Sequence, residues 1–163
     1  MSTNAIEMLK AEHRAVEELF KKFEKAASGD ARRKVFEEIA DALAVHATIE
    51  EKHFYPAAKA EATEDLLLEA AEEHLEIKRV IADLLAMDGS ADTFEAKVKV
   101  LQEDVEHHVE EEEEELFPKI AKILDDETLE TIAAQMEQTE GELLEAGNPR
   151  NAVPSETDAA APV

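Results

Sequence analysis

The 163-residue sequence contains no cysteine and no tryptophan, and it has only four glycines and five prolines. The missing cysteines exclude a disulfide scaffold, a thiolate zinc site and an iron–sulfur cluster, and they fit a reducing compartment. No apolar run reaches the length of about 18 residues that a membrane span needs, and the first residues lack the apolar core of a signal peptide. We therefore expect a soluble, cytoplasmic protein.

Basic residues are also scarce, because 17 lysines and arginines stand against 41 aspartates and glutamates and leave a net charge of −24. A surface this negative repels nucleic acids and anionic membranes, so we expect neither as a partner. Alanine, glutamate, leucine and lysine are abundant instead, a composition typical of helices. The length fits one domain of ordinary size with a real core.

Apolar residues spaced three and four apart predict helices and no strands. The predicted helices cover residues 4–27, 31–60, 64–87, 92–124 and, for a shorter fifth, 127–144. Short connections make neighbours antiparallel, so the predicted fold is all-α: an up-down-up-down four-helix bundle with a short fifth C-terminal helix. Residues 147–163 show no apolar period, and we expect a disordered tail after a 1–146 domain.

The sequence repeats internally, because a two-helix hairpin is used twice. The apolar stripe of the second predicted helix recurs 62 residues later in the fourth, and the stripe of the first recurs 61 residues later in the third. The repeat pairs His13 with His74, His46 with His108, and Glu50 with Glu112. It predicts an approximate two-fold axis with four histidines at equivalent places.

Each of the four long helices thus places a histidine within an apolar stripe, and two of them add a glutamate four residues later on the same face. A buried carboxylate is costly unless an opposite charge compensates for it, and no lysine or arginine lies on the stripes between the glutamates. Two metal ions bridged by the glutamates, and by an oxide, hydroxide or water, supply that charge and leave an open position. Imidazole and carboxylate ligands favour iron over manganese or zinc. The predicted ligands are His13, His46, Glu50, His74, His108 and Glu112.

Three neighbouring residues are predicted to have other roles. His107 points about 100° away from His108, toward a helix flank. His53 forms Glu-x-x-His with Glu50, a spacing also used in ferritin-type di-iron sites, but no second copy of the motif exists. Tyr55 is expected to pack near the end of the metal chamber, with a redox or proton role as the alternative.

The segments KAEHRAV, HATIEEKHFYP, AEEHLEI and HVEEEEEELFP resemble the hemerythrin-like (HHE cation-binding) domains over residues 1 to about 124. The resemblance implies a non-haem di-iron centre that meets dioxygen, hydrogen peroxide or nitric oxide. Lys78 departs from the oxygen-carrying hemerythrins, which have a second histidine one turn after the ligand equivalent to His74. Glu112, four residues after His108, departs too, since they have an aspartate five residues after. A less crowded iron favours peroxide chemistry or sensing over reversible oxygen carriage.

These residues are compatible with four functions. The preferred one is a di-iron protein that binds or turns over a small oxidant, with catalase-like activity included. The second is an iron- or oxygen-responsive module that binds without turnover, and the third is a ferritin-like enzyme that uses Glu50 and His53. The fourth is a metal-free bundle whose histidines are core residues satisfied by hydrogen bonds. The sequence does not set the oligomeric state.

Overall fold

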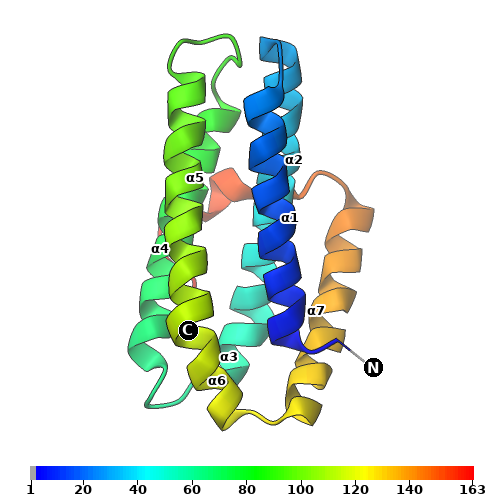
Figure 1. Cartoon of the computed structure of the whole chain (residues 1–163), viewed down its shortest axis with the longest axis vertical. Coiled ribbons are helices and arrows are strands. Elements are labelled where there is room, and N and C mark those ends of the chain that lie inside the picture. The colour runs from blue at the N-terminus through cyan, green and yellow to red at the C-terminus, as the bar shows by residue number, and fades with distance from the viewer. Residues whose placement is uncertain (1–2) are drawn as a thin grey trace.

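The computed structural model describes residues 3–163, and every regular element within that range is a helix. The four long helices are α1 (Ala5–Lys25), α2 (Gly29–Ile49), α4 (Glu64–Leu85) and α5 (Phe94–Glu111). They lie side by side along the long axis, and the colours of Figure 1 show α1 and α4 running one way and α2 and α5 the other. The predicted all-helical bundle is confirmed.

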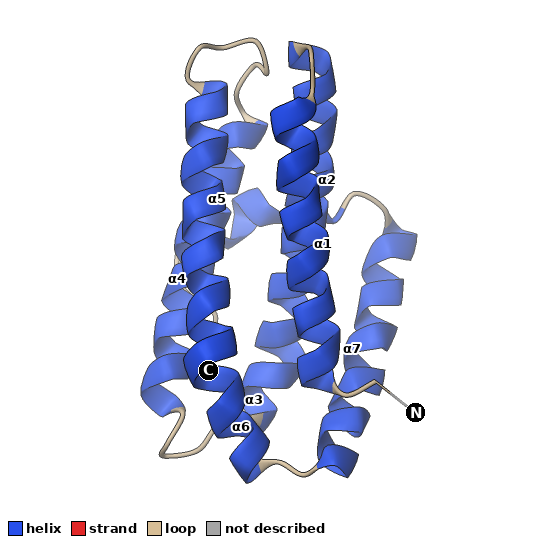
Figure 2. Ribbon diagram, in the orientation of Figure 1, coloured by secondary structure: helices blue, strands red, loops and turns tan. Residues whose placement is uncertain are grey.

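A fifth long helix, α7 (Asp126–Ala146), packs on the outside of the bundle against α1 and α2, as Figure 2 shows. It begins where Asp125 accepts a hydrogen bond from the backbone N–H of Thr128. In α1, Asn4 and Glu7 form a reciprocal capping box that fixes its first turn. None of the helices between residues 3 and 163 is both long enough and apolar enough to cross a bilayer.

Both α2 and α5 continue through a π-helical turn into a short helix. These elements are η1 (Glu50–Phe54) and α3 (Tyr55–Ala57) in the first half, and η2 (Glu112–Leu116) and α6 (Phe117–Ile123) in the second. The backbone N–H of Tyr55 donates to the carbonyl of Glu50, five residues back, and Phe117 does the same with Glu112. Pro56 and Pro118 follow directly in the two copies. Each interrupts the regular backbone hydrogen bonding of its helix, because proline has no N–H to donate.

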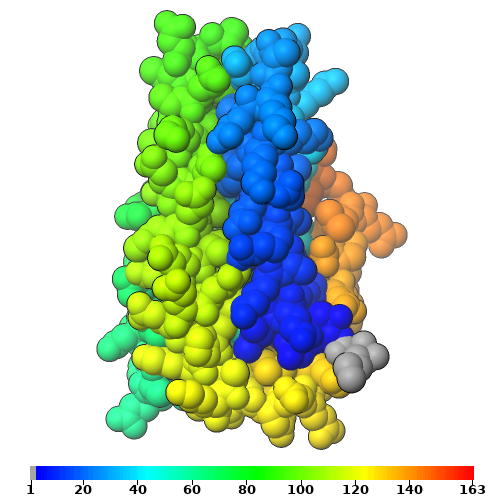
Figure 3. All heavy atoms as spheres, viewed as in Figure 1, coloured from blue at the N-terminus to red at the C-terminus, as the bar shows by residue number. Residues whose placement is uncertain are grey.

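The core forms two apolar clusters with the histidines between them. One cluster contains Leu9 of α1 and the aromatic residues of α3 and α6, whereas the other contains Val16 of α1. His13 lies between Leu9 and Val16 on the same buried face of α1. The side chains of α1 and α5 meet on the face seen in Figure 3. The fold thus places a layer of imidazoles across the middle of a packed bundle.

The last segment differs from the predicted disordered tail. After α7, Gly147 turns the chain with a φ of 82°, which glycine adopts without strain. Residues Pro149–Glu156 then form a 3-10 helix, η3, which lies against α2 and α4. Val153 is fully buried there. No apolar period predicts this segment, because one valine provides its contact with the core; the domain boundary at residue 146 stays a prediction.

Candidate metal centre

One histidine from each of four long helices and one glutamate from each π turn meet in the interior of the bundle. These are the six residues predicted from the repeat: His13, His46, Glu50, His74, His108 and Glu112. All six are buried, and His46, the most exposed of them, is 7% exposed. The structure brings the whole set together, and their role as ligands stays a prediction.

The six side chains form two groups that share the glutamates. In the first group, His13 Nε2 lies 3.2 Å from His46 Nε2 and 3.2 Å from Glu112 Oε2, and His46 Nε2 lies 3.2 Å from Glu50 Oε1.

In the second group, His74 Nε2 lies 3.1 Å from His108 Nε2 and 3.0 Å from Glu50 Oε2. His108 Nε2 lies 3.5 Å from Glu112 Oε1. Each glutamate therefore presents one oxygen to each histidine pair, which is the arrangement of a bridging carboxylate between two metal ions.

The outer nitrogen of each histidine meets a second carboxylate. These contacts join His13 Nδ1 to Glu113 at 2.8 Å, His46 to Glu12 at 2.5 Å, His74 to Glu51 at 3.0 Å and His108 to Glu73 at 3.2 Å. A carboxylate accepts hydrogen bonds, so each Nδ1 is placed to donate one and each Nε2 points inward, where it can coordinate a metal ion when it carries no proton. The sequence analysis missed these four glutamates, although each directly precedes a repeated histidine or follows a repeated glutamate.

The inward lone pairs fit metal ions better than they fit each other. When both Nε2 atoms of a pair lack a proton, they repel at 3.2 Å, and the buried oxygens Glu50 Oε1 and Glu112 Oε2 then have no hydrogen-bond partner. A cation between the nitrogens and oxygens of each group satisfies all of them at once. Mixed imidazole and carboxylate ligands suit iron, zinc and manganese in this setting. The residues present therefore fit the predicted pair of ions.

Protons and metal ions compete for this site. Burial alone would lower the pKa of His74, but its bonds with Glu50 and Glu51 outweigh burial and raise it to about 9. The pKa of His46 is likewise raised well above its ordinary value, because Glu50 and Glu12 outweigh burial. Burial would raise the pKa of Glu50, yet His46 and His74 hold it well below its usual range. Without metal, protonated imidazoles therefore supply part of the positive charge.

Tyr55 lies in the second group. Its Oη donates to Glu112 Oε1 at 2.6 Å and lies 3.1 Å from Glu50 Oε2 and 3.2 Å from His74 Nε2. In a regular α-helix a residue five after Glu50 would point about 140° away from it. The π turn adds a residue to that turn and brings Tyr55 back to the site. Burial, then the charges of Glu112 and Glu50, raise the pKa of Tyr55 well above its ordinary value.

The equivalent of Tyr55 in the other half is Phe117, whose ring lies parallel to that of His13 with centroids 5.9 Å apart. Lys78, the residue that departs from the oxygen carriers, is also buried, and its Nζ lies 2.9 Å from both carboxylate oxygens of Glu51. Lys78 thus fixes the position of Glu51, the carboxylate that faces His74 Nδ1. Tyr55 Oη, and not open space, lies beside His74 Nε2.

His53 and His107 lie outside the buried group. His53 Nε2 lies 2.6 Å from Thr139 Oγ1 on α7, so it ties η1 to that helix and does not complete a ferritin-type pair. The His107 side chain is 63% exposed and faces Glu111 at 3.2 Å and Glu73 at 3.6 Å on the surface. Its position on the helix flank agrees with the predicted register.

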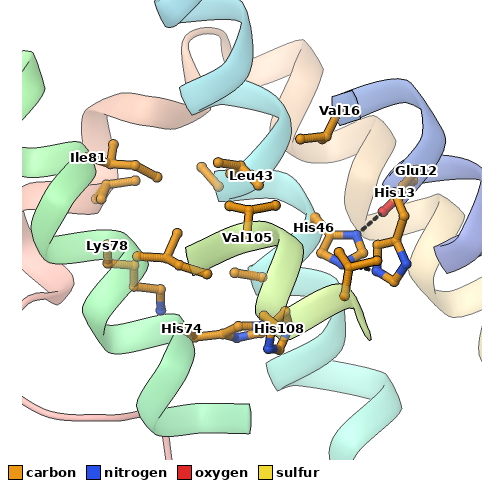
Figure 4. Close-up of a pocket in the computed structure, with 15 residues that line it drawn as sticks. Glu12, His13, Val16, Leu43, His46, His74, Lys78, Ile81, Val105 and His108 are labelled. Carbon is orange, nitrogen blue, oxygen red and sulfur yellow. Dashed lines mark hydrogen bonds and ion pairs between the residues drawn. The ribbon is translucent and has the colours of Figure 1, made fainter. Parts of the chain in front are cut away.

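A small apolar cavity borders the four histidine rings, as Figure 4 shows. The remaining walls are apolar apart from Glu12 and Lys78, and they include Val16, Leu43, Ile77, Ile81, Val105 and Val153. Its volume is about 30 Å³, while one water molecule needs roughly 10–15 Å³. The cavity therefore has room for a molecule of two heavy atoms next to the imidazoles.

The fold and the site define the class of this protein: a helical bundle that surrounds a buried cluster of histidines and glutamates compatible with metal binding. The family model of the hemerythrin HHE cation binding domain matches residues 4–120. The chain belongs to this family, as its four sequence motifs predict.

Two known proteins are similar to this chain. The crystal structure of a hemerythrin HHE cation binding domain-containing protein from Mycobacterium kansasii has a TM-score of 0.78 and 28% sequence identity, and the match covers 94% of this chain and 99% of that one. A DNA nickase from Nostoc sp. is 27% identical over 140 residues. That match covers 86% of this chain and 40% of the nickase, so the chain spans less than half the length of this relative.

Proposed function

We propose that the chain holds two iron ions in the buried cluster and there binds or reacts with a small oxidant, hydrogen peroxide first and dioxygen or nitric oxide next. The observation that carries the proposal is that two pairs of imidazole nitrogens converge on the two carboxylates of Glu50 and Glu112. An iron pair supplies redox chemistry and a position at which the oxidant binds.

In this proposal the histidines and glutamates divide into two ligand sets, and Tyr55 makes one set different from the other. His13 and His46 would hold one ion, His74 and His108 would hold the other, and Glu50 and Glu112 would offer one oxygen to each ion. This division follows the two groups of contacts that the side chains form.

Tyr55 belongs to the second set. Its Oη is 3.2 Å from His74 Nε2 and 3.1 Å from Glu50 Oε2, and these two atoms are 3.0 Å apart, so all three are spaced like ligands of one ion. The first set has no such group, because Phe117 occupies the equivalent place. An ion held by His13 and His46 would therefore have fewer protein ligands than its partner and would leave more room for the oxidant.

The surrounding residues prepare the site for this chemistry. The apolar walls limit water beside the imidazoles, and the outer glutamates orient the rings so that each Nε2 points inward. Without metal, Tyr55 holds a proton at Oη, within reach of the carboxylates of Glu50 and Glu112. Breakdown of peroxide needs no other reductant, because one peroxide is oxidised to dioxygen while a second is reduced to two waters.

DNA nicking, the activity named for the relative from Nostoc, is not part of the proposal. The match spans 40% of that protein, and a chain with a net charge of −24 repels a DNA backbone. Buried histidine and glutamate side chains are also out of reach of a phosphodiester.

Metal analysis combined with peroxide assays tests the proposal. Protein reconstituted with ferrous iron under anaerobic conditions should hold two irons per chain and show near-ultraviolet absorption that changes when peroxide is added. Oxygen evolution would establish turnover, whereas a spectral change without oxygen evolution would favour the binding and sensing role. Protein that takes up no iron contradicts the proposal.

A further inference from the structure

The C-terminal segment η3 closes one side of the cavity that borders the proposed metal centre. Val153 is the residue through which it does so, because this side chain is 0% exposed and lines the cavity. It belongs to the same apolar cluster as Leu43 and Ile81, which line the cavity from α2 and α4. One valine of a short 3-10 helix thus completes a wall that long helices otherwise form.

Polar contacts hold η3 in place on both sides of Val153. On the α2 side, the backbone N–H of Arg150 donates to Asp41 Oδ1 at 2.9 Å, and its guanidinium donates to Asp41 Oδ2 at 2.8 Å. On the α4 side, Arg79 Nε donates to the carbonyl of Thr157 at 3.0 Å. These contacts lie at or near the surface, where each contributes little, so the segment can open locally without unfolding the bundle.

The other walls are less able to move. A surface groove between α1 and α5 reaches Val16 and Val105 from outside, but both side chains are buried on long helices. The groove and the cavity also share His13 and Val109, and these side chains too stand on long helices. Opening the cavity on that side therefore requires one long helix to shift against its neighbours. Moving Val153 breaks the contacts of Arg150 and Arg79 and exposes one buried valine, but it shifts no long helix. The cavity therefore opens most readily at η3.

We propose that η3 is the entrance to the cavity and that Val153 determines which oxidants pass. Hydrogen peroxide, dioxygen and nitric oxide, with two heavy atoms each, fit a cavity of about 30 Å³. Alkyl hydroperoxides do not fit until Val153 is made smaller or η3 is released. This inference rests on the proposed function, since it specifies the substrate class of the same site.

The first test compares two peroxides on the iron-loaded full chain. The rate measured is that at which each peroxide oxidises the diferrous protein, whose two ferrous ions supply the two electrons that reduce tert-butyl hydroperoxide to the alcohol and water, or hydrogen peroxide to two waters. In Val153→Ala, the rate with tert-butyl hydroperoxide relative to the rate with hydrogen peroxide should rise by roughly tenfold, the discrimination that a methylene-sized gap provides. Val35→Ala is the matched control: it makes the same change in the same apolar cluster, at a residue that does not line the cavity. Its ratio should equal that of the wild type.

The second test needs no metal. Arg150→Ala removes a contact of η3 and leaves the lining of the cavity unchanged. In the metal-free protein, backbone amides of residues 150–157 should exchange with solvent faster by roughly tenfold, because breaking one such contact makes local opening easier. Amides of α2 should exchange at the wild-type rate. The iron-loaded variant should also accept the larger peroxide.

The outcomes separate this inference from the proposed function. Unchanged peroxide ratios in Val153→Ala and Arg150→Ala, each with two irons per chain, would overturn the inference and leave the proposed function standing. Protein without iron would overturn both, and metal analysis identifies that case. If Val153→Ala does not fold, the Arg150→Ala variant decides whether the inference holds, because the Arg150 side chain is not part of the core.

Discussion

The hydroxyl of Tyr55 lies 2.6 Å from Oε1 of Glu112, on the side of the site that contains His74. The residue at the equivalent place in the other half is Phe117, which stacks on His13 and has no hydroxyl. The repeat therefore places the histidines and glutamates symmetrically, and a single oxygen atom breaks the symmetry. The two proposed metal positions are therefore chemically different, and this difference can be measured.

Tyr55→Phe tests whether the hydroxyl belongs to a ligand set. A ferric ion next to Tyr55 Oη favours the phenolate, so the oxidised iron-loaded protein should absorb visible light through phenolate-to-iron charge transfer. The variant should lose this absorption while it keeps two irons per chain. The double variant Tyr55→Phe/Phe117→Tyr moves the hydroxyl to the His13 half and should restore a band. An absorption band that survives in Tyr55→Phe would rule out this role.

His74→Ala tests the ligand assignment. It removes one of two imidazoles from the second group, so iron content should fall from two per chain to one or fewer while the helical content stays the same. His107→Ala is the matched control, because the side chain of His107 is 63% exposed, and this variant should retain two irons. Equal iron loss in both variants would argue against assigning His74, and not His107, to the ligand set.

Glu51→Gln and Glu73→Gln test the outer carboxylates. Each change weakens the hydrogen bond that a proposed ligand histidine donates from Nδ1. It should lower iron affinity by roughly 10–100-fold, measured by competition with a chelator. Glu114→Gln, at an exposed glutamate of the acidic run 110–115, should leave the affinity unchanged. Glu51→Gln should also reduce the free energy of unfolding more than Glu73→Gln, because it leaves the buried Lys78 without its ion pair.

The metal-free protein should lose stability as the pH rises from neutral. The pKa of His74 is raised from 6.5 to about 9 in the folded state, so its contribution is fully present below pH 6.5 and is lost as the pH passes 9. The pKa of Glu50 is lowered, so its contribution is present above its ordinary value of 4.5 and is lost on acidification.

Urea unfolding across a pH series should therefore place the greatest stability of the metal-free protein between pH 4.5 and 6.5. Iron-loaded protein should show the opposite trend from pH 6 to 8, because metal ions bind only deprotonated imidazoles. A metal-free protein that becomes more stable toward pH 9 would contradict the protonation assigned to His74.

The sequence predicted the helices and the six converging residues because both depend on helical periodicity, which a stripe of residues such as His13 and Val16 preserves. It did not place the Tyr55 hydroxyl among the histidines and glutamates, because a π turn shifts the register by one residue and no local pattern signals that shift. Glu113 was missed because it lies within the run of glutamates 110–115, which the sequence alone suggests is a solvent-exposed helix face. Val153 was missed because a single valine among polar residues forms no periodic apolar pattern.

The bridging position of Glu50 and Glu112 also bears on how the protein matures. Each two-helix hairpin brings two histidines and one glutamate to one of the two groups, and an oxygen of the other hairpin's glutamate completes that group. If the site binds iron as proposed, the first hairpin leaves the ribosome with three of its four ligands, and the fourth, Glu112, comes with the second hairpin. Bound iron would then join the two halves, and the iron content of a preparation would report how much of it has assembled correctly.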